Sequence, residues 1–533
     1  MTTAAVLGGL PAGLPVGDGW VATGGTVPVR FPFDGSLVAD APVGTPELAR
    51  AAVDAAVAAR PAMAGMPAHA RRAALAAVGD QLRRHRDDLV DLLVLETGKP
   101  LGDCRAEADR AILTVQAATE EVGRIHGETV ALDMTPAGEG MTGFWVRRPI
   151  GVVVGITGFN YPLLLAAHKI APAIAAGCPV ICKPAPQAPL AVLRLAALCR
   201  AALRIAGGPA AGVQVVTGDA EVGSALVTDR RVGAVSFTGS AAVGHQIARD
   251  AAPAKVLLEL GSNSALIVAR DASLAAAADA VARGGFYASG QACISVQRVL
   301  VDERVAPEFT GLLMHRVAQL RTGDPRLEST SVAALIDAAA TRRVRDWVAA
   351  AVRAGARVVT GDGAQAGASA TDGADSADGA VAAVGPDTPD SASAARGADL
   401  GGGADGARGP LGPVVLADVP EDADIWAEEV FGPVVCLRTV RGIDEAIEVA
   451  NASRYGLHAS VFTSSLSTAL TALRRLEVGG VVINEVPGFR ADNMPYGGVK
   501  DSGLGREGPR FAAEEFTVTV MAVLKPLPTL EAP

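Results

Sequence analysis

Short runs rich in β-branched residues, separated by alanine-rich stretches of helical character, constrain this chain more than any other feature. The runs are Val152 to Ile156, Val180 to Lys183, Val213 to Val216 and Val232 to Phe237. Apolar runs of this length are typical of strands that are buried on both faces. Their alternation with helices predicts an α/β fold, with a mostly parallel sheet covered by helices.

The chain is too long for one simple core. Its 533 residues suggest roughly two to four structural units. A helical region is expected from Thr45, an N-cap residue followed by proline, to about Leu95. A second β/α alternation begins near Glu259 and resumes after an unusual insert at residues 361–412.

The insert consists mainly of Gly, Ala, Asp and Ser, with eight Asp, two Arg and no Lys, Glu or aromatic residue. Such a segment cannot bury enough apolar surface to offset the entropy that is lost on ordering. We therefore expect a disordered acidic surface loop. The alternative is a partner-binding or regulatory element, although inserts between secondary elements are often tolerated without a function.

The composition argues against several classes of protein. A net charge of −10 and the absence of a long Lys/Arg cluster argue against nucleic-acid or membrane partners. No secretory signal is expected, and the apolar run from Ile150 to Ala167, interrupted by glycines and a proline, is better explained as a buried strand and turn. Six scattered cysteines indicate reduced thiols, and Cys178 and Cys182 lack a second ligand pair for zinc. We expect a cytoplasmic protein without a metal site.

Three residues are candidates for chemistry. Cys293 follows small residues that leave room for a substrate, and a thiolate attacks carbonyl carbons readily, although a lone cysteine is more often structural. Glu259 ends an apolar run before a glycine turn and should have a raised pKa, which suits a base that activates water. The alternative for Glu259 is a capped or ion-paired carboxylate. Asn160 offers an amide to a developing oxyanion, but Asn is also a common turn residue.

A fourth segment, Phe237-Thr-Gly-Ser-Ala-Ala-Val-Gly, leads from a strand end into a helix start. Backbone N–H groups there can hold a pyrophosphate, and Ser240 adds a hydroxyl group. Gly239 alone is weak evidence, because many strand-to-helix turns need glycine for steric reasons.

Together these segments resemble the aldehyde dehydrogenase superfamily from about Glu96 to the C-terminus, apart from the insert. The family's order of motifs is matched by Asn160, Lys183, Gly239-Ser240, Glu259, Cys293 and Glu429-Val-Phe-Gly-Pro. Glu259 precedes Cys293 by 34 residues, the usual spacing, whereas the 136 residues from Cys293 to Glu429 exceed the family norm by most of the insert.

The resemblance implies the aldehyde dehydrogenase fold, with a Rossmann-like cofactor domain, a second α/β catalytic domain and a small β oligomerisation element. The expected cofactor-binding domain comprises residues 1–129 and 149–258, and the catalytic domain comprises residues 259–480. Residues 130–148 and 481–533 are expected to be oligomerisation and bridging segments. A homodimer or homotetramer follows by analogy.

The resemblance also implies roles for single residues. Cys293 would be the nucleophile, the Asn160 amide and the Cys293 backbone N–H would form the oxyanion hole, and Glu259 would activate the water that hydrolyses the thioester. The implied cofactor contacts are Lys183 and Glu429 with the riboses, Phe431 beside the nicotinamide ribose, and Gly239 and Ser240 with the pyrophosphate.

Two positions depart from the family pattern. Pro186 stands where many NAD-preferring relatives carry a glutamate that grips the adenosine ribose and repels a 2′-phosphate. NAD is therefore the expected cofactor, with NADP as the alternative. Ser262 replaces a commoner glycine and adds only a hydroxymethyl group.

The segments around Cys293 and from Val486 to Lys500 look most like a subgroup that acts on small anionic aldehydes, which includes lactaldehyde, sulfolactaldehyde, phosphonoacetaldehyde and glyceraldehyde-phosphate dehydrogenases. Arg105, Arg298 and Arg490 are candidates for an anion clamp, because guanidinium groups suit carboxylate, sulfonate or phosphonate oxygens. Surface or interdomain ion pairing is the alternative for each. His168 either faces the same pocket or is a core histidine.

The expected function is therefore NAD(P)-dependent oxidation of a small anionic aldehyde to its carboxylic acid. A CoA-acylating enzyme is one alternative, but such relatives generally lack the glutamate that Glu259 matches. A cofactor-binding protein without turnover is another, and it would not need Cys293, Glu259 and Asn160 together.

Overall fold

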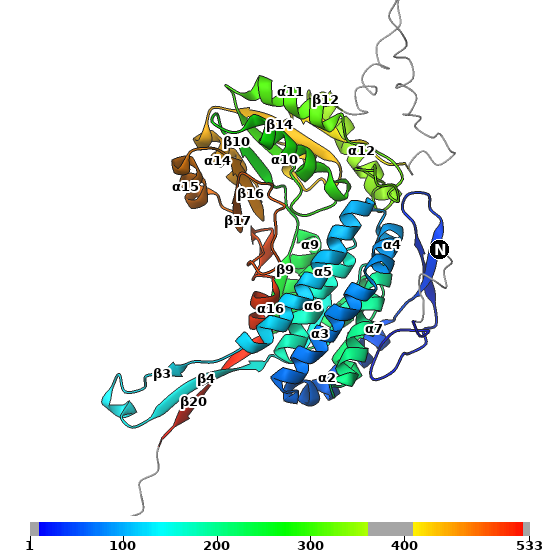
Figure 1. Ribbon diagram of the computed structural model, residues 1–533, viewed down its shortest axis with the longest axis vertical. Helices are drawn as coiled ribbons and strands as arrows, with labels where there is room; N and C mark the ends of the chain where they lie inside the picture. Colours follow the sequence, from blue (N-terminus) through cyan, green and yellow to red (C-terminus); the bar gives the residue numbers. More distant parts are fainter. Residues whose placement is uncertain (1–9, 361–408, 526–533) are drawn as a thin grey trace, which may run out of the picture.

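The computed structural model describes residues 10–360 and 409–525. Within these residues the chain forms two α/β units and a β ribbon that projects from the first of them (Figure 1). Of the predicted acidic insert at 361–412, residues 361–408 lie outside the described part of the chain.

The first unit contains a six-stranded sheet that confirms the predicted β/α alternation. Its strand order is β19-β9-β8-β5-β6-β7, and all neighbouring strands are parallel except β19 and β9. The strands are β5 (Val152–Ile156), β6 (Val180–Lys183), β7 (Val213–Val215), β8 (Val232–Thr238), β9 (Lys255–Glu259) and β19 (Gly503–Leu504). The order reverses between β5 and β8, and ligands of such sheets bind at the carboxyl ends of the strands beside the reversal.

Helices pack around this sheet. They are α2 (Pro46–Gly65), α3 (Ala68–Arg84), α4 (Arg86–Thr97), α5 (Leu101–Glu121), α6 (Pro162–Ala176), α7 (Leu190–Ile205), α8 (Ala220–Val227), α9 (Ala241–Asp250) and α16 (Pro509–Glu515). Helix α2 begins where predicted, because the Thr45 hydroxyl accepts a hydrogen bond from the Leu48 N–H at 3.3 Å and proline occupies the first turn. Helix α5 packs against α3, α4 and α6, which places it beside the loop that follows β5.

The second unit contains a seven-stranded sheet of order β12-β13-β14-β11-β10-β16-β17, parallel except for β12 and β13. Its strands are β10 (Ala265–Val268), β11 (Arg298–Asp302), β12 (Arg357–Thr360), β13 (Val414–Ala417), β14 (Val434–Val440), β16 (His458–Phe462) and β17 (Gly480–Ile483). Its helices are α10 (Leu274–Phe286), α11 (Ala306–Val317), α12 (Ala338–Arg353), α13 (Asp424–Ala427), α14 (Ile443–Asn451) and α15 (Leu466–Arg475). Alternate residues of β10 enter two separate apolar cores, one on each face of the sheet.

The β ribbon consists of β20 (Thr517–Leu524), β4 (Thr142–Pro149) and β3 (Thr129–Val130), which pair antiparallel in that order. Two smaller antiparallel pairs are β1 (Thr26–Arg30) with β2 (Leu37–Pro42), and β15 (Tyr455–Gly456) with β18 (Val499–Lys500). The predicted bridging segment at residues 481–533 therefore has a further part in the fold, because it also supplies β19 to the edge of the first sheet.

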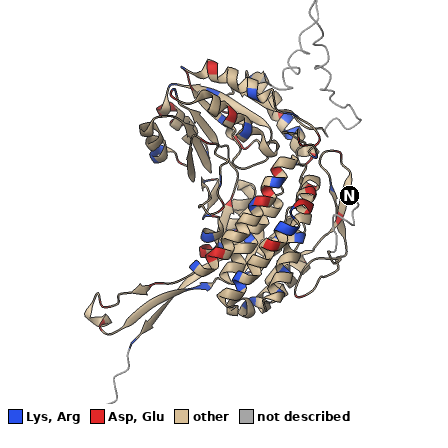
Figure 2. Ribbon diagram, in the orientation of Figure 1, with Lys and Arg blue, Asp and Glu red and all other residues tan. Residues whose placement is uncertain are grey.

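The described residues contain no helix that is long and apolar enough to cross a membrane. In the same part of the chain, no group of His, Cys, Asp and Glu side chains is arranged to hold a metal ion. Acidic and basic residues are interspersed along the helices (Figure 2).

Candidate active site

Cys293 lies just after a strained turn at the end of α10. The turn, η4 (Tyr287–Gly290), contains Ala288 and Ser289 with φ values of 48° and 56°. Residues with a side chain rarely adopt this left-handed conformation, which costs of order 1–3 kcal/mol each. Among the six cysteines, Cys293 alone is not fully buried. The turn therefore presents the one partly accessible thiol of the chain.

The Cys293 thiol is protonated at neutral pH. Its pKa is raised to about 12, chiefly by burial and also by the carboxyl groups of Glu429 and Glu259. A hydrogen bond between Sγ and the Tyr496 hydroxyl, at 3.1 Å, opposes this rise. Because the thiolate is the nucleophilic form, the thiol must lose its proton before it attacks a carbonyl group.

Asn160 lies in the loop between β5 and α6, at the strand end beside the reversal of the sheet. Its side-chain Nδ2 donates a hydrogen bond to the Gln291 carbonyl oxygen at 2.9 Å. This contact brings Asn160 to the loop that carries Cys293. An amide has two N–H donors, so one hydrogen bond to Gln291 leaves the second N–H for another acceptor.

Glu259 is the last residue of β9 and is 6% exposed. Its Oε2 is buried and makes no hydrogen bond within the described residues. Burial raises its pKa well above the ordinary value, and the nearby Glu507 carboxylate adds to the rise. Gly497 packs so closely that a Cβ atom there would lie 2.9 Å from Glu259 Oε1. Glu259 is therefore a buried carboxyl group with a raised pKa, and this direction agrees with the expectation from the sequence.

A buried ionic network beside Glu259 escaped the sequence analysis. Glu507 accepts a hydrogen bond from Lys169 Nζ at 3.1 Å through Oε1 and one from Arg490 Nη2 at 3.2 Å through Oε2. The two cations overcome the effect of burial and lower the pKa of Glu507 to about 2. The Arg490 guanidinium also lies 3.7 Å from the centroid of the Tyr496 ring, which links the network to Cys293. Nothing in the sequence pairs Lys169 with Glu507, which is 338 residues away.

Comparison with known proteins identifies the family. Residues 20–374 and 391–521 match the model of the aldehyde dehydrogenase family. This chain belongs to the aldehyde dehydrogenase family.

This aldehyde dehydrogenase is 38% identical over 449 residues to 3-sulfolactaldehyde dehydrogenase from Priestia aryabhattai, and the match covers 84% of each chain. Aldehyde dehydrogenase 21 from Physcomitrella patens, solved in complex with the reaction product succinate, has a TM-score of 0.85 at 33% identity and covers 97% of this chain and 99% of its own. Glyceraldehyde-3-phosphate dehydrogenase from Methanocaldococcus jannaschii, complexed with NADP, has a TM-score of 0.82 at 32% identity, with 94% and 99% covered. The predicted family and fold are confirmed.

The residues that the family resemblance assigns to a dinucleotide fit such a ligand at several points. Lys183 is buried, its pKa is lowered by burial, and its ammonium group makes no hydrogen bond within the described residues. A buried cation without a hydrogen-bond partner suits ribose hydroxyl groups. Glu429 accepts a hydrogen bond from the Ser262 N–H at 2.9 Å, and burial raises its pKa to about 7. Phe431, with a φ of 47°, makes an edge-to-face contact with Phe159 at 5.8 Å.

The structure changes the expectation for Gly239. Its N–H donates to the Glu259 carbonyl oxygen at 3.0 Å, so this group is not free for a pyrophosphate. A Cβ atom at Gly239 would lie 2.5 Å from the Phe237 ring, which explains the glycine sterically. Ser240 precedes α9 and does not cap it with its side chain. The free donors are therefore the Ser240 hydroxyl and the first N–H groups of α9.

Two of the three predicted anion-binding arginines are engaged elsewhere. Arg105 is exposed and forms two hydrogen bonds with Glu328, at 2.5 and 2.8 Å. The buried Arg298 side chain donates to the carbonyl oxygens of Asn263, Val449 and Ala450 at 3.0–3.1 Å. A guanidinium group that is satisfied by backbone carbonyls has little left for a substrate, so Arg298 has a structural role. Only Arg490 lies beside the Cys293 site.

A fourth arginine, Arg110, was missed. It pairs with Asp492 at 2.9 Å, and Asp492 Oδ1 also lies 3.4 Å from His168 Nε2. His168 is fully buried, burial lowers its pKa to about 4, and neither ring nitrogen makes a hydrogen bond within the described residues. His168 is therefore a neutral histidine near Arg490, whose charge contributes to the low pKa.

Proposed function

We propose that this aldehyde dehydrogenase oxidises a small aldehyde with an anionic end to the corresponding carboxylic acid, with NAD or NADP as the cofactor. The observation that carries the proposal is the convergence of three groups. The partly accessible Cys293 thiol lies on a loop that Asn160 contacts, and the buried Glu259 carboxyl group is close enough for its charge to raise the pKa of that thiol.

The chemistry follows from these groups. Cys293 Sγ releases its proton to water and attacks the carbonyl carbon, and the Asn160 amide and the Cys293 backbone N–H stabilise the oxyanion of the thiohemiacetal. A bound nicotinamide would supply the hydride acceptor, because the thiohemiacetal becomes a thioester only when it loses a hydride. The Glu259 carboxylate then takes a proton from water, whose oxygen attacks the thioester carbon, and the C–S bond breaks to release the acid and the Cys293 thiolate, which leaves the proton on Glu259.

The surroundings of Glu259 control how readily it loses a proton. Only the ionised carboxylate can accept a proton from water, and the adjacent Glu507, Lys169 and Arg490 influence the electrostatic cost of forming it. The cations favour the charged form of Glu259, whereas burial and Glu507 oppose it. These opposing effects act on a potential base that is buried away from bulk water.

Arg490 supports an anionic substrate. Its side chain is 6% exposed, its Nε makes no hydrogen bond within the described residues, and it stacks on the Tyr496 ring that adjoins Cys293. Arg110 is a second cation in this region, although it is paired with Asp492, which also approaches His168. The named relatives point the same way, because sulfolactaldehyde, glyceraldehyde 3-phosphate and the product succinate all carry an anionic group.

Reduced-nicotinamide absorbance tests the proposal. The wild-type enzyme and Cys293→Ala are compared with NAD and with NADP, across lactaldehyde, glyceraldehyde 3-phosphate, phosphonoacetaldehyde, succinate semialdehyde and butanal. We expect turnover to concentrate on anionic aldehydes and to vanish in Cys293→Ala. Because Pro186 leaves no carboxylate at that position to repel a 2′-phosphate, we expect both cofactors to work, with NAD preferred. Equal turnover of butanal would contradict the anionic class, and absence of turnover with every pair would contradict the function.

We also propose a homodimer or homotetramer built through the β ribbon. Several apolar side chains of the ribbon are exposed, namely Val130, Val146, Val518, Met521, Val523 and Leu524. An isolated ribbon of this kind needs a covering surface for independent stability. Light scattering during size-exclusion chromatography tests this: Met521→Asp/Val523→Asp should shift the mass toward the monomer, and an unchanged mass would contradict the proposal.

The free thiols suit a reducing compartment, and a cytoplasmic location stays a prediction.

A further inference from the structure

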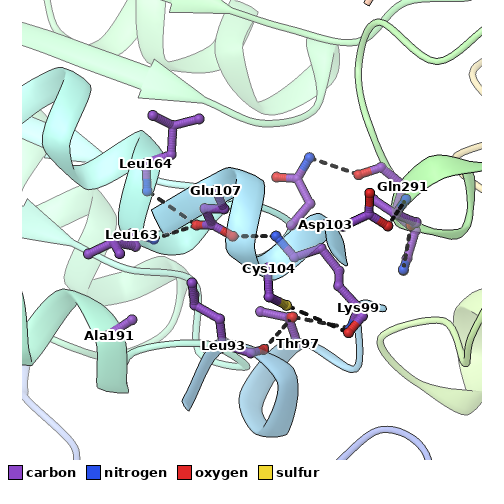
Figure 3. A network of polar contacts seen from close by, with 12 residues as sticks. Leu93, Thr97, Lys99, Asp103, Cys104, Glu107, Leu163, Leu164, Ala191 and Gln291 are labelled. Carbon is purple, nitrogen blue, oxygen red and sulfur yellow. Dashed lines mark hydrogen bonds and ion pairs between the residues drawn. The ribbon is translucent and has the colours of Figure 1, made fainter. Parts of the chain in front are cut away.

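Two acidic side chains of one helix, α5, contact the two loops that would form the oxyanion hole. Asp103 and Glu107 are four residues apart in α5, so their side chains leave the same face of the helix. Asp103 contacts the turn before Cys293, and Glu107 contacts the helix after Asn160 (Figure 3). Helix α5 is thus the common support of both loops.

Glu107 caps the helix that follows Asn160. Its Oε1 accepts hydrogen bonds from the backbone N–H groups of Leu163 at 2.9 Å and Leu164 at 3.2 Å, in the first turn of α6. The N-cap residue, Tyr161, makes no side-chain hydrogen bond to these groups. Glu107 therefore provides the acceptor that Ser or Asp usually provides at this position, and a negative charge is favoured there. Fixing the first turn of α6 fixes the loop that carries Asn160.

The other oxygen of Glu107, Oε2, accepts a hydrogen bond from Lys99 Nζ (Figure 3). Both side chains are fully buried. Lys99 Nζ also lies 3.7 Å from the centroid of the Tyr161 ring, which ties the ion pair to the neighbour of Asn160. A buried ion pair often stabilises a fold no more than apolar residues of the same volume would. The ion pair between Lys99 and Glu107 is better explained by the position in which it holds the Glu107 side chain than by a gain in stability.

Asp103 holds the strained turn η4. Its Oδ2 accepts a hydrogen bond from the Ala288 N–H at 2.8 Å, and Ala288 is the first of the two left-handed residues. From the other side, the Ser289 hydroxyl donates to the Ala333 carbonyl oxygen at 3.1 Å and accepts from the Ala333 N–H at 2.9 Å. These contacts fix the turn from which the Cys293 backbone N–H is presented.

We propose that Asp103 and Glu107 are positioning residues that set the separation of the two oxyanion-hole donors, the Asn160 amide and the Cys293 backbone N–H. This inference rests on the proposed aldehyde oxidation. Neither acid contacts the substrate, because Glu107 acts through α6 and Asp103 acts through η4. A misplacement of about 1 Å in such a site costs on the order of a hundredfold in rate, so the effect should appear in kcat.

The test for Glu107 compares Lys99→Met/Glu107→Gln with Lys99→Met/Glu107→Met in the full-length enzyme, on the best aldehyde at saturating cofactor. Both variants remove the whole ion pair and with it the effect of Lys99 on Asp103, so they differ only in that Gln keeps an oxygen for Leu163 and Leu164. We expect kcat to be roughly ten- to a hundredfold lower in the Met form, whereas alkylation of Cys293 by iodoacetamide, which forms no oxyanion, should differ by less than about twofold.

A double-mutant cycle separates positioning from general damage. In an Asn160→Ala background, the difference in kcat between the Gln and Met forms should disappear, because the group through which Glu107 acts has been removed. A difference of the same size in both backgrounds overturns the assignment of Glu107. Asp103 is tested in the same way: Asp103→Asn keeps an oxygen for the Ala288 N–H and should keep kcat, whereas Asp103→Ala should lose it. The two Asp103 variants break no ion pair of the described residues, so they still test the inference if the Lys99 variants do not fold.

Glu96 provides the matched control. It is fully buried and caps α7 in the same manner, accepting from the Leu190 N–H at 2.8 Å and the Ala191 N–H at 3.0 Å. Glu96→Gln and Glu96→Met should differ in thermal stability but not in kcat. An equal loss of kcat in the Glu96 and Glu107 pairs overturns the inference, whereas a wild-type enzyme without turnover contradicts the proposed function itself.

Discussion

The pKa of about 12 for Cys293 makes a quantitative prediction for its reaction with a small aromatic disulfide. At pH 8 such a thiol is about 0.01% thiolate, whereas an ordinary exposed thiol of pKa about 8.5 is roughly one quarter thiolate. The two thiolate fractions therefore differ by about 2,400-fold. The more basic thiolate is intrinsically more nucleophilic, and a Brønsted coefficient of about 0.45 makes it roughly 40-fold more reactive. We therefore expect Cys293 to react roughly 60-fold more slowly than a free thiol at pH 8.

Release of 4-thiopyridone from 4,4′-dithiodipyridine measures this rate, with Cys293→Ala as the baseline because the other cysteines are buried. Between pH 7 and pH 9.5 the logarithm of the rate should rise by about one per pH unit without levelling, whereas the rate of a model thiol levels above about pH 8.5. Tyr496→Phe should slow the reaction further, because it removes the hydrogen bond that lowers the pKa. A plateau already reached by pH 8 would refute the reasoning, since it would mean a stabilised thiolate in the resting enzyme.

Three further results are expected. Glu259→Gln should lower the steady-state rate by about 10²- to 10⁴-fold without slowing the disulfide reaction of Cys293, because removal of the Glu259 charge lowers the pKa of the thiol, and a variant that keeps its turnover would exclude Glu259 as the base. Arg490→Ala should lower kcat/KM for succinate semialdehyde by about ten- to a hundredfold relative to butanal, with a smaller loss in Arg490→Lys, and equal losses on both aldehydes would contradict an anion site. Burial raises the pKa of Glu96 to about 8, so the folded state holds a proton that the unfolded chain loses above about pH 4.5. The stability that this proton contributes is complete below that pH and is lost as the pH rises toward 8, so thermal unfolding of Glu96→Gln should depend less on pH between 5 and 8, and identical pH profiles would contradict the raised pKa.

Local patterns predicted the parts of the fold that depend on neighbouring residues. The strands from Val152 to Phe237 could be predicted because parallel strands that are buried on both faces need continuous apolar runs. The start of α2 at Thr45 was predictable for a similar reason, since a cap and a proline act within one helical turn. Glu259 was predicted to have a raised pKa from its apolar run alone, and its burial agrees.

Contacts between distant segments were beyond the reach of such patterns. Arg298 and Arg490 look equally suited to bind an anion in the sequence, and only the fold shows that Arg298 faces the carbonyl oxygens of Val449 and Ala450. The pairing of Lys169 with Glu507, and the use of the Gly239 N–H by the Glu259 carbonyl oxygen, likewise depend on tertiary packing. In each case the sequence indicated what kind of interaction the residue could make, but it did not indicate with which residue.

The antiparallel pairing of β19 with β9 links Glu259, the proposed base, to the order in which the chain is synthesised. Gly503 and Leu504 pair with Glu259 and Leu258, so the strand that carries Glu259 lacks its outer neighbour until the ribosome has passed residue 504. A product truncated after Arg490 contains every side chain proposed to touch the aldehyde, yet its base is left at an open sheet edge. Incomplete translation products of this gene should therefore be inactive and prone to aggregate, because an unpaired edge strand recruits other strands.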